Sequence, residues 1–169
     1  DSLTGLGNRR SFENHFNSVV DAITSDTPIT AMMVTLPSLA NINQTVSYQD
    51  GDEHVHDVSV TLQNVFGTLT NSKIFRLNGS TFIALVPFDI QFLNRTRLDI
   101  NDAFSKKKNS LHVNGFANLA LVSVDKGSSI GGVLSALDTG CTIGDTAINN
   151  KVDKDTLFSV KEWRSLIQS

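Results

Sequence analysis

The densest group of side chains that could do chemistry lies at residues 50–57, which read Asp-Gly-Asp-Glu-His-Val-His-Asp. Carboxylates and imidazoles bind metals, and residues four apart on a helix share one face, so a metal site at the surface is geometrically conceivable. However, His54 and His56 are two apart and therefore point to different sides. No third strong ligand can be assigned from the sequence. We predict that residues 50–57 form the solvated start of a helix and that the chain holds no metal there.

Cys141 is the single cysteine of the chain. One cysteine excludes an internal disulfide and fits a reducing compartment. The serine and histidine residues occur without a nucleophile elbow or the context of a catalytic triad. We therefore predict that Cys141 is a buried packing residue and not a nucleophile.

The charge balance excludes some classes of partner. The net charge is -3, and only 18% of the 169 residues are charged, so the chain has no field that would attract nucleic acid or an anionic membrane. The basic run at residues 106–108 is interpreted as a helix C-terminus, which the helix dipole favours. No apolar stretch reaches the roughly 20 residues needed to cross a bilayer, and no signal peptide is visible.

Hydrophobic periodicity predicts the elements that would position a site. Helical spacing predicts helices at about residues 9–25, 39–46, 50–69, 90–107 and 130–148, and apolar runs predict strands at residues 29–36 and 116–124. Two more strands flank Asn78-Gly79, a dipeptide favoured in tight hairpin turns because both residues accept positive φ. This order of elements predicts one domain of the α/β (α+β) class, with helices packed on a mixed or antiparallel sheet.

Residues 1–12, DSLTGLGNRRSF, resemble the opening signature of GGDEF domains, the diguanylate cyclase family, whose form is D-x-L-T-G-L-x-N-R-R-x-F. Ile42-Asn43 and Gly51-Asp52 keep part of a second family stretch. Residues 76–85 stand where the family's R-Y-G-G-D-E-F-A-I-L hairpin belongs. The resemblance covers nearly the whole chain and implies a nucleotidyl-cyclase-like fold, with a central, mainly antiparallel five-stranded sheet wrapped by helices.

The same resemblance implies that the catalytic chemistry has been lost. Active members join two GTP molecules with metal ions held by carboxylates. The family's metal-binding Asp after the first strand aligns with Thr35, and its G-G-D-E turn aligns with Asn78, Gly79, Ser80 and Thr81. A hydroxyl is neutral and is a poor sole ligand for a hard cation. We therefore expect no catalytic residue, no metal or other cofactor, and negligible turnover.

Asn43 and Asp52 keep the positions that the resemblance assigns to guanine contacts. Each also has a structural interpretation, because Asn43 could cap the end of one helix and Asp52 could stabilise the start of the next. The family's two phosphate-binding lysines align with Ala40 and Asp145, and the carboxylate of Asp145 would repel a triphosphate. Nucleotide binding at Asn43 and Asp52 therefore stays open.

The C-terminal residues carry a second resemblance. Trp163, Arg164 and Leu166 are similar to a W-R-x-L helix that joins the degenerate GGDEF domain to the EAL domain in cyclic di-GMP receptors of the LapD type. We therefore divide the chain into a degenerate GGDEF domain, residues 1–152, and a linker helix, residues 153–169, that leads to an EAL domain. The three residues would make interdomain contacts. The alternative is a tail helix that packs Trp163 on its own domain.

Together these inferences predict a catalytically inactive GGDEF domain that acts as a regulatory and interaction module in bacterial cyclic di-GMP signalling, such as the control of biofilms. The chain begins at Asp1 without Met, so we expect a cytoplasmic fragment of an inner-membrane receptor, attached to the membrane only through segments outside this chain. The expected partners are an EAL domain of the same chain and a second copy in a homodimer of the full-length protein. The alternative function is a GTP-sensing pseudo-cyclase that tunes a neighbouring phosphodiesterase domain.

Overall fold

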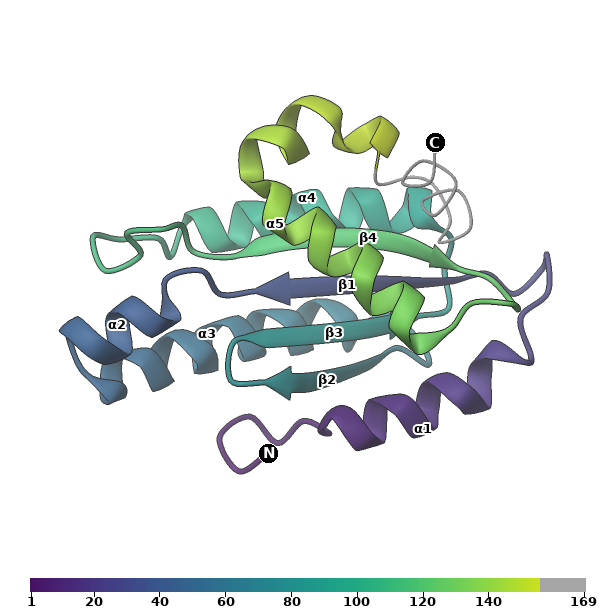
Figure 1. The fold of residues 1–169 in the computed structure, drawn as a ribbon, viewed down its shortest axis with the longest axis horizontal. Coiled ribbons are helices and arrows are strands. Elements are labelled where there is room, and N and C mark those ends of the chain that lie inside the picture. Colours follow the sequence, from purple (N-terminus) through teal and green to yellow (C-terminus); the bar gives the residue numbers. More distant parts are fainter. Residues whose placement is uncertain (156–169) are drawn as a thin grey trace.

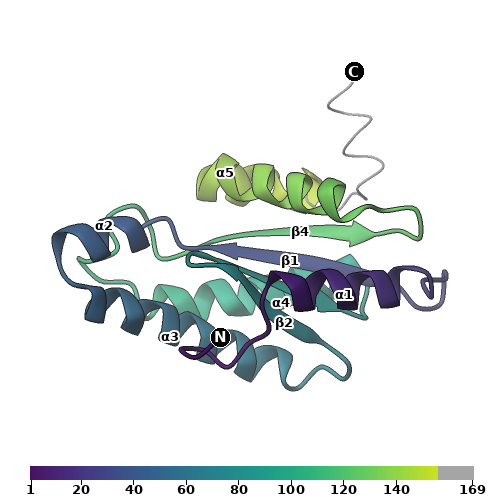
Figure 2. The same ribbon diagram turned by 60° about the horizontal axis from the view of Figure 1, so that its bottom comes forward.

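A four-stranded sheet lies between two layers of helices (Figures 1 and 2). The computed structural model describes the backbone of residues 1–155 and the side chains of residues 1–143. The strands are β1 (Ile29–Thr35), β2 (Lys73–Asn78), β3 (Thr81–Val86) and β4 (Asn118–Val124). The helices are α1 (Arg9–Val20), α2 (Leu39–Thr45), α3 (Tyr48–Phe66), α4 (Ile90–Ser105) and α5 (Ile130–Asp155). All nine elements lie where the hydrophobic pattern predicts them, with helix ends shifted by a few residues.

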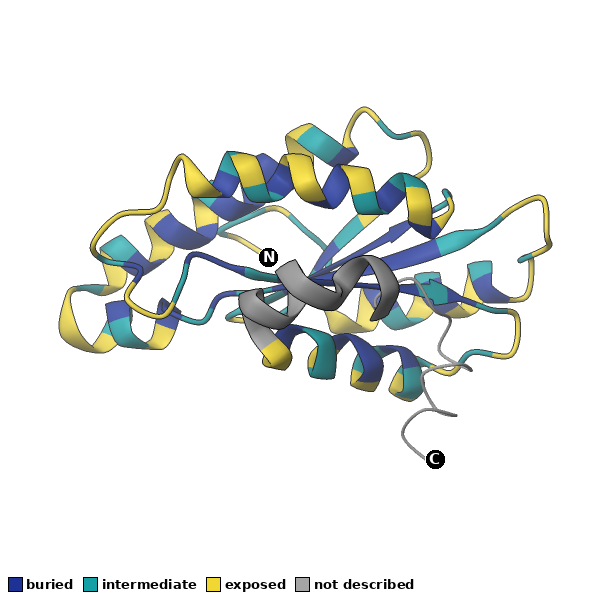
Figure 3. Cartoon of the chain, turned by 90° about the horizontal axis from the view of Figure 1, so that it is seen from above, coloured by how far each residue is buried: buried dark blue, intermediate teal, exposed yellow. Residues whose placement is uncertain are grey.

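The two faces of the sheet support separate hydrophobic cores, as the alternation of side chains along a strand requires. On β1, Met32 and Val34 pack against α3 and α4, while Ala31 and Met33 pack against α1 and α5. The middle five residues of β1 are therefore all buried, which explains the continuous apolar run in the sequence. Figure 3 shows the buried positions on the sheet and on the helix faces turned toward it. Helices cover both faces, so the α+β prediction is confirmed.

The strand order is β2-β3-β1-β4, and every pair of neighbours is antiparallel. The expectation of five strands is wrong for the described residues, which form four. Four strands follow from the apolar pattern, whereas the fifth came only from the resemblance. After β4 the described backbone forms a short loop and then α5, which packs on the sheet face and adds no strand to its edge.

The turn of the β2–β3 hairpin differs from its prediction. Asn78 pairs with Thr81, so the two turn residues are Gly79 and Ser80, one position later than expected. Neither Asn78 nor Gly79 has a positive φ. The backbone N–H of Ser80 donates to Asn78 Oδ1 at 3.0 Å, a local turn that asparagine favours, and the register shifts between Arg76 and Asn78. The side-chain hydrogen bond and the irregular pairing together replace the predicted left-handed turn.

Within the described part of the chain, no helix is both long and apolar enough to cross a membrane.

Candidate functional site

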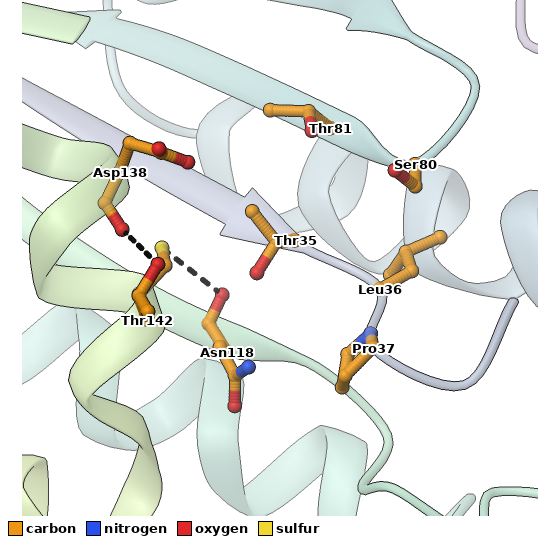
Figure 4. Close-up of a pocket in the computed structure, with 9 residues that line it drawn as sticks. Thr35, Leu36, Pro37, Ser80, Thr81, Asn118, Asp138 and Thr142 are labelled. Carbon is orange, nitrogen blue, oxygen red and sulfur yellow. Dashed lines mark hydrogen bonds between the residues drawn. The ribbon is translucent and has the colours of Figure 1, made fainter. Parts of the chain in front are cut away.

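One pocket lies at the end of the sheet where β1 ends and where β3 and β4 begin. Its volume is about 290 Å³ (Figure 4). Thr35, the last residue of β1, is paired with Thr81 of β3 on one side and with Asn118 of β4 on the other. The hairpin turn is fixed to the end of β1 because Leu36 N–H donates to the Ser80 carbonyl at 2.9 Å. The lining residues are Thr35, Leu36, Pro37, Ser80, Thr81, Asn118, Asp138, Cys141 and Thr142.

The pocket collects three of the five positions predicted to be degenerate. Thr35, Ser80 and Thr81 line it, although they come from strands far apart in the sequence. Asn78 and Gly79 do not line it, because Asn78 turns its side chain oxygen onto Ser80 within the hairpin turn. The three hydroxyl groups are neutral, so this side of the pocket presents no carboxylate to a cation.

Helix α5 closes the other side of the pocket with Asp138, Cys141 and Thr142 (Figure 4). Asp138 is exposed and is the only carboxylate among the described residues that line the pocket, and no lysine, arginine or histidine is among them. Thr142 Oγ1 donates to the Asp138 carbonyl at 2.8 Å, which keeps this hydroxyl on its own helix. Within the described residues, no three His, Cys, Asp or Glu side chains are placed to hold a metal ion.

Cys141 lines the pocket and is 3% exposed, so the prediction of a buried packing residue is confirmed. Its thiol contacts the carbonyl oxygens of Met33 and Asn118, each at 3.7 Å. Burial raises the pKa of Cys141 to about 12; a hydrogen bond from Thr35 lowers it and the charge of Asp138 raises it. The thiol is therefore protonated at neutral pH and is not an activated nucleophile.

Asn43 and Asp52 lie outside this pocket, at the packing of α2 against α3. Gly51 lies so close to Asn43 that an added Cβ would overlap its side-chain oxygen. Asn43 Oδ1 is buried and has no hydrogen-bond partner among the described residues. Asp52 is exposed on the next position of α3. Helix α2 ends at Thr45 with Val46 as its C-cap, so Asn43 is not the cap that its structural interpretation proposed. Helix α3 begins at Tyr48, and the acidic residue of its first turn is Asp50, so Asp52 lies beyond the turn that it was expected to stabilise.

Arg76 joins the N-terminal segment to the hairpin turn. Its guanidinium donates to Asp1 Oδ2 at 2.9 Å and to the Gly79 carbonyl at 2.8 Å. The backbone N–H of Arg76 also donates to the Gly7 carbonyl at 2.9 Å. Burial lowers the pKa of Arg76, and the charge of Asp52 raises it. The opening signature of the chain is thus bonded directly to the strand that leads into the pocket.

The prediction of a solvated start of a helix at residues 50–57 is wrong for His54. His54 is only 3% exposed and contacts the segment that precedes β4, whereas His56 is exposed. The helix begins two residues earlier than predicted, at Tyr48, with Ser47 Oγ accepting from Asp50 N–H at 3.0 Å. His54 therefore falls on the face that the later segment covers.

Sequence reasoning missed Asn118, Asp138 and Thr142 as pocket residues. Asn118 could have been found from its place at the start of a predicted strand, because strand ends collect at the edge of a sheet. No sequence pattern marks Asp138 or Thr142 as a pocket residue, because only the docking of α5 on the sheet brings them to the pocket. The side chain of Asp145 and the predicted contacts Trp163, Arg164 and Leu166 lie outside the described residues, as does most of the predicted linker helix.

Comparison with known proteins agrees with this fold. An uncharacterised membrane protein of Staphylococcus aureus (strain USA300) is 28% identical over 114 residues, which are 67% of this chain and 31% of that protein. The chain thus spans about a third of the length of the curated relatives it matches. Two solved structures are similar in fold: diguanylate cyclase SiaD of Pseudomonas aeruginosa in complex with its activator SiaC, and the S helix-GGDEF-EAL part of Vibrio cholerae LapD bound to c-di-GMP.

Both structures give a TM-score of 0.72. SiaD is 16% identical, with 85% of this chain and 56% of that chain covered, and LapD is 21% identical, with 99% and 40% covered. The family model for the GGDEF domain, described as "Diguanylate cyclase, GGDEF domain", matches residues 1–141. The matched region includes the opening signature, the whole sheet and every residue that lines the pocket except Thr142. The chain therefore belongs to the GGDEF domain family.

Proposed function

We propose that this GGDEF domain is catalytically inactive and serves as a regulatory and interaction module in cyclic di-GMP signalling. The observation that carries the proposal is the pocket at the ends of β1 and β3, where Thr35, Ser80 and Thr81 present neutral hydroxyls in place of the family's carboxylates. Metal ions supply several kcal/mol of transition-state stabilisation in such reactions, and each ~1.4 kcal/mol is about tenfold in rate. Asp138 is the only carboxylate among the described residues that line the pocket, and without further anionic ligands the domain would lose that contribution.

The activity assay is incubation with GTP and either Mg²⁺ or Mn²⁺, followed by measurement of cyclic di-GMP. We expect no product above the level of a reaction without protein. Clear turnover would overturn the proposal.

A metal-binding experiment tests the physical reason. The triple variant Thr35→Asp, Ser80→Asp, Thr81→Glu restores carboxylates, and the variant Thr35→Asn, Ser80→Asn, Thr81→Gln has nearly the same shape without charge. We expect Mn²⁺ to bind the carboxylate variant measurably more tightly than the amide variant or the natural chain. Equal binding by both variants would show that this pocket is not the place of a lost metal site.

The wider setting of the module is also a proposal. LapD combines GGDEF and EAL parts in one chain, SiaD binds an activator protein, and the Staphylococcus relative is a membrane protein. These likenesses support a cytoplasmic domain of an inner-membrane protein that contacts an EAL domain of the same chain or a second copy of itself. In this setting surface contacts carry the signal and the pocket does no chemistry.

A second function, a GTP-sensing pseudo-cyclase, is favoured by one observation. Asn43 Oδ1 is buried without a partner among the described residues, and Asp52 directly follows Gly51, the residue of α3 that lies against Asn43. An amide and a carboxylate in this position could recognise the edge of a guanine base. Calorimetric titration with GTP, compared with the Asn43→Ala variant, distinguishes the two functions. Binding that depends on Asn43 would support the sensor, and no heat at millimolar GTP would remove it.

A further inference from the structure

Two histidines are buried side by side at the edge of the α3 layer. His54, on α3, is 3% exposed, and His112, in the segment that connects α4 with β4, is 7% exposed. Their ring centroids lie 4.5 Å apart, and Phe116 contacts both rings at 4.5 and 4.7 Å. We call His54 and His112 the histidine pair. Their contact joins the connecting segment to α3.

The burial of His54 and the surroundings of its second ring nitrogen favour a neutral ring. Its Nε2 lies 3.1 Å from the Phe116 carbonyl, which can only accept, so Nε2 carries the proton. Nδ1 is then a lone pair, and it is buried with no partner among the described residues. A second proton on Nδ1 would place a positive charge where no acceptor is described, which burial makes costly.

A hydrogen bond of His112 requires that this ring is neutral as well. The backbone N–H of Asn109 donates to His112 Nδ1 at 3.1 Å, so this nitrogen must be unprotonated. A proton on Nδ1 would put two donors against each other and break the bond. Protonation of His112 would therefore break a bond of the packed segment, and protonation of His54 would leave a buried charge without an acceptor among the described residues.

The charges around the histidine pair do not reverse the preference of both rings for the neutral form. For His54, burial lowers the pKa to about 4; His112 also lowers it, while the bond to Phe116 and the charge of Asp57 raise it. For His112, burial is again the largest cause and lowers the pKa, Asp57 raises it and Lys108 lowers it. Asp57, on α3, and Lys108, just after α4, are the charged groups that act on the pair from the elements packed around it.

The connecting segment also holds two parts of the pocket lining in place. Asn114 N–H donates to Ser38 Oγ at 2.9 Å, and the same hydroxyl donates to the Gly115 carbonyl at 2.7 Å. Ser38 is completely buried and directly follows Pro37, which lines the pocket. The segment ends at Asn118, another lining residue. A movement of the segment would therefore alter both walls that Pro37 and Asn118 provide.

We propose that the histidine pair is an acid-sensitive switch that holds residues 109–116 against α3 and the Pro37–Ser38 turn, and that protonation of either ring releases this segment. The open segment exposes both rings to water, where a histidine has its ordinary pKa. Because the open state binds more protons between about pH 6.5 and pH 4, the closed state is fully favoured above pH 6.5 and is lost progressively as the pH falls toward 4.

Hydrogen exchange of the segment's backbone amides measures the opening directly. With a pKa of about 4 closed and 6.5 open, His54 alone increases the opening equilibrium about 30-fold between pH 7.5 and pH 5. We expect the protection factors of Asn109 and Asn114 to fall by about this factor, after correction for intrinsic exchange, while amides in the middle of β1 change much less. Protection that is independent of pH in this range would overturn the proposal.

Matched variants separate the switch from general acid sensitivity. Gln at position 54 can keep the donor to Phe116, and Asn at position 112 can keep the acceptor for Asn109, but neither titrates. We expect the double variant His54→Gln, His112→Asn to lose most of the pH dependence, and the exposed control His56→Gln to keep it. The same dependence in the double variant would contradict the proposal. Should that variant not fold, ring titration by NMR decides, because a His54 pKa above 6 in the natural chain refutes the switch.

Discussion

The substitution Gly140→Ala tests how closely α5 must approach the sheet. A Cβ at this position would lie 2.8 Å from the Cβ of Ala120 on β4. Carbon atoms in favourable contact are about 3.5–4.0 Å apart, so α5 would have to move away by roughly 1 Å. Overpacking of this kind costs about 1–3 kcal/mol, and the better helix propensity of alanine offsets up to about 1 kcal/mol. We expect a net loss of about 1–2 kcal/mol in the free energy of unfolding.

Urea denaturation followed by circular dichroism measures this loss, and the chain offers a control on the same helix. A Cβ at Gly131 meets no atom within 4 Å, so Gly131→Ala should leave stability unchanged or raise it by up to about 1 kcal/mol. Adding Ala120→Gly to Gly140→Ala removes the overlapping methyl group. The double variant should therefore be more stable than the sum of the two single effects predicts.

A steric clash at Gly140 is refuted if Gly140→Ala is as stable as Gly131→Ala, or if the two effects at positions 140 and 120 simply add. Either result would mean that the contact between α5 and β4 adjusts without cost. The close approach at Gly140 also brings Asp138 and Cys141 to the pocket, so a freely adjusting contact would mean that these two residues are not held there firmly.

Two further predictions concern single groups. Burial raises the pKa of Cys141 to about 12, so little of its thiol is deprotonated at pH 8. We expect it to react with Ellman's reagent about 1000-fold more slowly in the folded chain than in urea. Equal rates would contradict this prediction. Replacing Asp1 by Asn removes the charge that pairs with Arg76 at 2.9 Å, where both side chains are less than a fifth exposed. We expect a loss of about 1 kcal/mol in urea denaturation, and none for Asp26→Asn in an exposed turn; equal stabilities would refute a role for the pair.

Much of the fold could be predicted because its elements carry strong local patterns. The apolar run of β1 predicts a strand covered on both faces, and spacings of three and four predict the five helices. The hairpin was also predicted, but its turn was placed one residue early. That error arose because the Asn78 side chain bonds to Ser80, a local alternative that the preference of Asn-Gly for positive φ does not take into account.

The site was predictable only where residue type alone carried the argument. The absence of carboxylates at Thr35, Ser80 and Thr81 is visible in the sequence, and the structure brings these residues to one pocket. The burial of His54 was not predictable, because Asp52, Glu53 and Asp57 make this stretch of the sequence look like a solvated helix start. The segment around His112, which lies more than 50 residues later in the chain, covers His54.

The sequence by itself determined the family signature, the succession of helices and strands, and the chemical character of the strand ends, since these depend on residue type and local spacing. Only the tertiary structure decided that α5 adds Asp138 and Cys141 to the pocket, that Arg76 bonds the N-terminal segment to the hairpin, and that two histidines share a buried contact. The physical reason is that burial and long-range pairing depend on how helices dock on the sheet. A local pattern shows which face of an element is apolar, but not which distant segment will cover it.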